Sequence, residues 1–230
     1  MKIASLLKYT LLLLLLGVTM GCVHQLPEHA KPRFLAPNPD DPISRNGFSY
    51  RLLEMSDFQA KFLPVDYHQY SHKIGALSCI SIRPSRGAKI KIVQSYFQDI
   101  LFYGGTISEL KFEAFFFPGC SWWNKDIPKS REEYVLQHEQ IHFALVELAA
   151  RKLTDEVGYE VKNYLAIGNT HDQIREEITE KLKNMVRKMM EVSLEDHTDF
   201  DKDTSMFYDP QAQQKWLENV HIRLSEQDSL

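Results

Sequence analysis

The chain has 230 residues, which leaves room for one folded domain with at most a short appendage. Its composition, 43% hydrophobic and 11% aromatic, predicts a sizeable buried core. The net charge of -4 lacks the basic excess of a nucleic-acid surface, so we expect no nucleic-acid partner.

Residues 1–22 have the pattern of a secretory signal peptide. Lys2 supplies a basic start, residues 11–16 are an unbroken leucine run, and the small residue Gly21 precedes Cys22. The apolar run is shorter than the ~20 residues that a membrane-spanning helix needs. We therefore expect cleavage of this segment and export of the protein.

Cys22 is the candidate lipidation site. Residues 18–22 resemble the bacterial lipobox, whose cysteine is lipidated and becomes the mature N-terminus. The alternative is an ordinary cleaved signal with an incidental cysteine. Val23, where some lipoproteins have Asp, resembles the sorting pattern of outer-membrane lipoproteins. The expected location is thus the outer membrane, with the N-terminal lipid as anchor and the domain in the periplasm.

Residues 23–47 are rich in proline and predict a tether, followed by one domain at residues 48–228. Two cysteines remain in the domain, Cys79 and Cys120. Neither belongs to a CxxC motif, which disfavours a structural zinc cluster. In an oxidising compartment we expect them to form a disulfide.

From residue 74 to residue 117 the sequence predicts three or four strands. Polar and apolar residues alternate at 77–82 and 89–92, and the last strand is expected at 110–117. Turns are expected at Gly87, residues 104–105 and residues 118–119. An aromatic strand such as 112–117 is usually core, but it could also be an edge strand that pairs with extended substrate. Trp122 and Trp123 are expected to cover the sheet rather than wall a cleft.

The rest of the chain predicts three helices. The first begins at Ser130, whose spacing to Glu133 is that of a capping box, and ends near Gly158. The second covers about 172–192, and the third begins at Asp209. Strands followed by helices, without βαβ alternation, predict an α+β fold: a small, mainly antiparallel sheet followed by three helices, with the first helix packed on the sheet.

The first predicted helix carries the motif His138-Glu139-Gln140-Ile141-His142. His138 and His142 are four residues apart and share a helix face, so both imidazoles could reach one metal ion. Glu139 is placed to take a proton from a water on that metal, which is the chemistry of the HExxH motif of zinc peptidases. The candidate site therefore has His138 and His142 as zinc ligands and Glu139 as catalytic base.

The third ligand is left open by the spacing. Glu147 lies about 180° around the helix from His138, so in an unbroken helix it would face away and pair with Arg151. A ligand from later helices requires that they pack across the first one. The candidates there are His171, Glu176, Glu177, His197 and Asp201.

Several segments resemble the bacterial DUF922 family, secreted proteins described as zinc-dependent proteases. The similar segments are 56–59, 121–123, 136–143, 147–151, 200–204 and 213–216. The resemblance implies a zincin-like fold, bound zinc and a peptide or protein substrate. Because Asp201 falls inside one of the family's elements, it stands beside Glu147 as candidate third ligand. The chain departs from the family pattern at Ile141, Met206 and Phe207.

The sequence thus predicts a zinc metallopeptidase of the bacterial cell envelope. A non-catalytic envelope lipoprotein that serves as a binding or scaffold module is the alternative. A third possibility is a structural zinc site closed by a fourth protein ligand. If the position of Met206 contributes to the metal site, its departure would weaken that site, whereas the intact motif favours an active enzyme.

Overall fold

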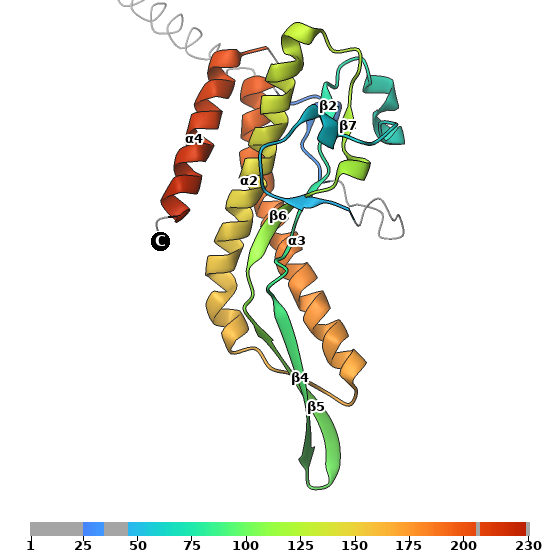
Figure 1. The fold of residues 1–230 in the computed structure, drawn as a ribbon, viewed down its shortest axis with the longest axis vertical. Coiled ribbons are helices and arrows are strands. Elements are labelled where there is room, and N and C mark those ends of the chain that lie inside the picture. Colours follow the sequence, from blue (N-terminus) through green and yellow to red (C-terminus); the bar gives the residue numbers. More distant parts are fainter. Residues whose placement is uncertain (1–24, 35–45, 206–207, 229–230) are drawn as a thin grey trace, which may run out of the picture.

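The computed structural model describes residues 25–34, 46–205 and 208–228 (Figure 1). The predicted signal peptide with its lipobox, much of the tether and the Met206–Phe207 pair lie outside these ranges. In the described part of the chain, no helix has the length and apolar character needed to cross a membrane.

The strands form three small antiparallel sheets. The first has the order β1-β6-β3, the second pairs β2 with β7, and the third has the order β4-β5-β8. The bounds are β1 Phe48–Ser49, β2 Ala76–Leu77, β3 Ile80–Pro84, β4 Lys89–Phe97, β5 Ile100–Ser108, β6 Phe112–Phe116, β7 Trp122–Trp123 and β8 Ala166–Gly168.

Three long helices follow: α2 (Lys129–Lys162), α3 (His171–Thr204) and α4 (Pro210–Asp228). The central helix, α2, is apolar on two sides. One side, including Phe143 and Val146, packs with β3 and β6 in the main core, and the other packs against α3 and α4 (Figure 1). The predicted α+β fold, with antiparallel sheets followed by three helices, is confirmed.

The start of α2 differs from the prediction. The residue before the helix is Pro128, in an extended conformation (φ -56°, ψ 135°), and no side chain caps the helix. Ser130 is already inside the first turn, so the expected capping box with Glu133 does not form. Proline suits this position because its φ is fixed and it has no N–H that would need a partner at a helix start.

The hairpin of β4 and β5 turns at Gln98 and Asp99, both with positive φ (47° and 63°), and not at the two glycines. The prediction of a turn at residues 104–105 was wrong, because Gly104 and Gly105 lie within β5. Gly105 allows a close approach of α3: a Cβ atom there would lie 2.2 Å from Cγ2 of Ile174. The two strands extend beyond the end of α2 (Figure 1).

Strand β6 is a central strand and not an edge. It lies between β1 and β3, and two of its amides meet α2: Ala114 N–H donates to Glu147 (3.1 Å) and Phe112 N–H donates to Thr154 (2.8 Å). The hypothesis that this strand pairs with substrate was therefore wrong. Its aromatic residues are buried, as expected of a core strand.

Cys79 and Cys120 form a disulfide, with their Cα atoms 5.7 Å apart. The bond connects the residue before β3 to the short helix η6 (Pro118–Cys120), just ahead of β7. In β7 the ring of Trp123 packs edge-on against Phe58 at 5.3 Å between centroids. The tryptophan thus covers the core, as the sequence predicted.

Residues 25–34, from the segment expected to be a tether, lie against the domain. Leu26 is buried, the guanidinium of Arg33 lies 5.9 Å from the ring centroid of Tyr67, and Phe34 contacts His197 edge-on at 5.5 Å. This part of the chain forms one wall of the cleft described below.

Candidate metal centre

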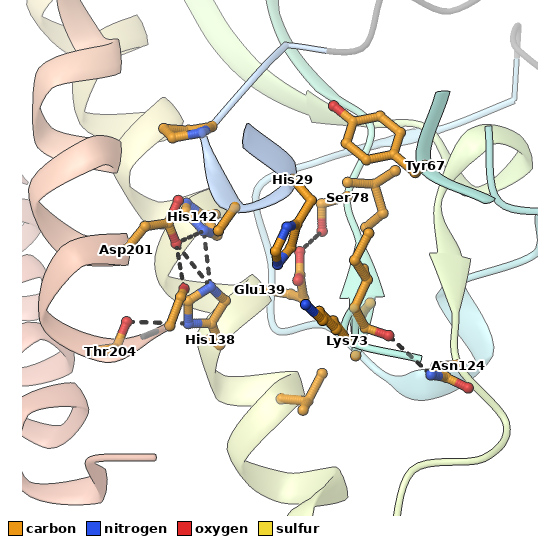
Figure 2. A pocket seen from close by; sticks show the side chains of 18 of the residues that line it. His29, Tyr67, Lys73, Ser78, Asn124, His138, Glu139, His142, Asp201 and Thr204 are labelled. Carbon is orange, nitrogen blue, oxygen red and sulfur yellow. Dashed lines mark hydrogen bonds and ion pairs between the residues drawn. The ribbon is translucent and has the colours of Figure 1, made fainter. Parts of the chain in front are cut away.

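The candidate centre forms where α2 lies beside the last turns of α3. His138 and His142 come from α2, and Asp201 comes from α3 (Figure 2). The prediction that the second helix ends near residue 192 was wrong, since α3 continues to Thr204. The polar residues 193–204 remain helical because Phe200 is fully buried against α2 and α4. This extension of α3 brings Asp201 to the histidines.

Three side-chain atoms converge on one point. Nε2 of His138 and Nε2 of His142 are 3.1 Å apart, and each lies 3.2 Å from Oδ1 of Asp201. For a tetrahedral ion with ligand distances of about 2.0–2.1 Å, neighbouring ligand atoms are about 3.3 Å apart. The observed triangle is close to one face of that tetrahedron. The group could therefore hold a metal ion.

The opposite nitrogen of His142 is held by His197. The two Nδ1 atoms are 2.7 Å apart, and the two rings are nearly parallel, at 8°. When Nε2 of His142 presents its lone pair to the centre, its Nδ1 carries the proton and donates it to His197. His197, a ligand candidate from the sequence, thus lies behind His142 and orients it, a common arrangement around metal-binding histidines.

His138 is supported by residues of α3. Its Nδ1 lies 3.4 Å from the hydroxyl of Thr204, which itself donates to the carbonyl of Phe200 (2.7 Å). The ring of Phe200 stacks on the His138 ring at 4.5 Å between centroids. Thr204 was not predicted to contribute to the site, although its position one turn after Asp201 puts both on the same helix face.

The charges of the centre are coupled. Burial is the largest influence on Asp201 and acts to raise its pKa, yet the two histidines outweigh it and hold the pKa well below its usual range. Burial also acts to lower the pKa of His142, but the carboxylates of Asp201 and Glu139 raise it above the ordinary value. Burial, reinforced by His142, lowers the pKa of His197 to about 3. His197 is therefore neutral and can accept a proton from His142.

Glu139 lies beside the histidines and lines the cleft (Figure 2). It is 6% exposed, and one of its oxygens accepts a hydrogen bond from Ser78, the residue after β2. Ser78 was missed by sequence reasoning because it is 61 residues away and belongs to no motif. The contact fixes one carboxylate oxygen of Glu139.

The next residue, Gln140, anchors another part of the chain. Its side chain accepts from Leu53 N–H (2.7 Å) and donates to the carbonyl of Arg51 (3.3 Å). Similarly, the buried Gln213 of α4 donates to Tyr134 and Gln137 of α2. These amides hold the elements around the motif helix in place.

Glu147 faces away from the centre. It pairs with Arg151 at 2.8 Å and accepts from Ala114 of β6. Three other ligand candidates, His171, Glu176 and Glu177, lie in the first two turns of α3, about 40 Å along the helix from Asp201 at 1.5 Å per residue. Of the candidates from the sequence, the structure brings Asp201 to the histidine pair.

The centre opens into a cleft of about 400 Å³. Its walls are α2, the end of α3, residues 72–78 and residues 29–34. Comparisons with protein-family models, with curated proteins and with solved structures found no match to this chain.

Proposed function

We propose that the protein is a zinc-dependent hydrolase that cleaves peptide bonds at the bacterial cell envelope. The observation that carries the proposal is the convergence of His138, His142 and Asp201 on one point, with Glu139 beside them in an open cleft. The likeness of the motif segments, which include these four residues, to secreted zinc-dependent proteases also supports the proposal.

Zinc suits this donor set. Two imidazole nitrogens and one carboxylate oxygen are usual zinc ligands, and catalytic zinc sites commonly have three protein ligands and one open position. Among the described residues, no further histidine, cysteine or carboxylate joins the three. This favours a catalytic site over a structural site that is closed by a fourth protein ligand.

A zinc ion held there would lower the pKa of a bound water and polarise the substrate carbonyl. Glu139 accepts the proton from the attacking water and returns it to the leaving amine. Ser78 engages one oxygen of Glu139, which leaves the other oxygen for this proton transfer. The cleft holds the substrate chain beside the ligand histidines.

The proposed location rests on the resemblance of residues 18–22 to the lipobox and on Val23. The lipid on Cys22 would anchor the protein to the outer membrane, with the domain on the periplasmic side. The Cys79–Cys120 disulfide is consistent with such an oxidising compartment.

Metal content tests the site. We expect about one zinc per chain in the soluble domain (residues 23 onward) and strongly reduced zinc in His142→Ala and Asp201→Ala. Asp199→Ala is the matched control, because this carboxylate is on the same helix but pairs with Lys202 on the surface. A zinc-free parent, even after zinc is offered, would instead support the binding or scaffold lipoprotein.

Turnover tests the reaction. Glu139→Gln should retain the zinc and lose peptide hydrolysis, because glutamine cannot accept the proton. If this variant hydrolysed peptides at the parent rate, the role of Glu139 as base would be wrong.

A further inference from the structure

We infer that the end of the cleft formed by Arg131 and Lys73 is a subsite for a carboxylate of the substrate. The inference rests on the proposed function and deepens it, since it names the chemistry of the substrate that the same cleft accepts. Three features of the cleft support it: the position of the two cations, their lack of partners and the distance of Arg131 from the candidate centre.

Arg131 lies on the cleft side of α2. It precedes His138 by seven residues, which is two helical turns, so both side chains share a face about 10 Å apart along the axis. Its guanidinium lies 5.1 Å from the ring centroid of Tyr208, and both residues line the cleft. The ring supports the guanidinium without neutralising its charge.

Lys73 is on a loop that is fixed beside the same stretch of α2. The side chain of Asn124 donates to the carbonyls of Ser71 (3.1 Å) and Ile74 (2.9 Å), which holds the loop on both sides of Lys73. Gly75, two residues after Lys73, packs against Val135. Val135 lies one helical turn after Arg131. Lys73 lines the cleft together with Asn124 and Glu139 (Figure 2).

Neither cation is paired. In the described part of the chain, Arg131 and Lys73 form no ion pair, whereas the other two cations of the cleft, Lys31 and Arg33, both bind Glu28. The exposed Asp126 lies at the same end but pairs with neither of them.

One end of the cleft thus carries two cations and one carboxylate, Asp126, which leaves a net positive charge there. The other carboxylates of the cleft, Glu139 and Asp201, are engaged at the candidate centre. Both cations are exposed side chains in the wall of the cleft, and unpaired cations of one sign along a cleft attract anions into it. The substrate would therefore lie with its scissile bond at the centre and its carboxylate at Arg131 and Lys73.

The distance limits the substrate. About 10 Å corresponds to roughly three residues of extended peptide, at about 3.3 Å per residue. The carboxylate can be the free C-terminus of a short peptide or an acidic side chain within about three residues of the cleaved bond. Both sources offer the same group to the two cations.

The test compares matched peptides on the zinc-loaded protein. Each peptide is made with a free C-terminus, with an amidated C-terminus, with every acidic side chain replaced by its amide, and with both changes together, which gives the fully amidated form. We expect the double variant Arg131→Gln, Lys73→Gln to lose about 10- to 100-fold in kcat/KM on carboxylate peptides and to be unchanged on fully amidated ones. Lys129→Gln is the control, because this cation is in the same helical turn but does not line the cleft.

The two arms identify the source of the carboxylate. A loss of rate on C-terminal amidation alone assigns the subsite to the chain terminus, and a loss on side-chain amidation alone assigns it to an acidic residue. An equal loss by the double variant on charged and fully amidated peptides, or no loss on either, would overturn the inference.

Binding separates this inference from the proposed function. The same peptides are titrated calorimetrically into Glu139→Gln, with and without the two cation replacements. If the parent cleaves none of the peptides but carboxylate peptides bind more tightly only when both cations are present, the subsite stands and the hydrolase proposal fails. If binding shows no preference for carboxylates either, the subsite fails too.

Discussion

At the scale of residues, His142 connects the candidate centre to His197, which orients it. One of its nitrogens meets His138 and Asp201, and the other meets His197. A histidine that is fixed in one tautomer and one orientation binds a metal more tightly than a free one, because less order has to be imposed on binding. His197 provides this fixation from a position where it cannot itself reach the centre.

Replacement of His197 should therefore weaken metal binding without removing a ligand. We expect His197→Ala to lower zinc affinity by about 10- to 100-fold, measured by competition with a chromogenic chelator. His197→Asn keeps an acceptor for the Nδ1–H of His142 and should restore most of the affinity. Unchanged affinity in His197→Ala would show that the contact does not orient His142.

For Glu147, in contrast, we expect no effect on zinc binding. Glu147→Gln should bind zinc as the parent does, because this side chain contacts Arg151 and Ala114 on the far side of α2. The amide can still accept from Ala114 N–H, so we expect a loss of only about 1 kcal/mol in the free energy of unfolding, measured with urea. A zinc content as low as that of Asp201→Ala would instead make Glu147 a ligand.

At the scale of elements, the position of α3 decides the site. Its first turns rest on the hairpin strand β5, where Gly105 faces Ile174 and Ile178, and its last turns carry Asp201 and Thr204 to α2. The contact at Gly105 is close because glycine has no side chain, which lets α3 pack directly on the backbone of β5.

A Cβ atom at residue 105 should disturb this close packing of α3 on β5. We expect Gly105→Ala to lower the free energy of unfolding by about 1–3 kcal/mol, because the new atom would lie 2.2 Å from Cγ2 of Ile174 and forces the helix to shift.

Gly104→Ala is the matched control in the same strand. Its Cβ would meet its nearest neighbour, Leu165, at an ordinary 3.5 Å, so its stability should stay close to that of the parent. Equal urea midpoints for the two variants would show that α3 does not pack on β5 as closely as described.

At the scale of the whole molecule, the candidate centre joins two helices, α2 and α3, that pack against each other from distant parts of the chain. The ligands of α2 and the ligand of α3 are about 60 residues apart in the chain. An ion that binds all three favours the folded state, because the unfolded chain does not hold the ligands together.

Zinc should therefore raise the thermal stability of the protein. At a free zinc concentration 100 times its Kd, we expect about 2.7 kcal/mol of added stability, and a chelator should remove it. Calorimetric melting of the parent and of Asp201→Ala, each with zinc and with chelator, measures the effect. Identical melting temperatures of the parent in the two conditions would argue against a folded-state metal site.

The sequence determined what depends on neighbouring residues. Strand and helix periodicity gave the α+β fold, since each element reflects a local pattern of burial. The four-residue spacing of His138 and His142 put both on one helix face for the same reason. The opposite placement of Glu147 also followed from helical geometry.

Only the tertiary structure decided the contacts that join distant segments. The polar residues 193–204 have little helical periodicity of their own, and the burial of Phe200 makes them the end of α3 and places Asp201 at the centre. Ser78 reaches Glu139, and β6 becomes a central strand, through packing across the fold. Such contacts depend on how whole elements pack, and no spacing within a single segment encodes that.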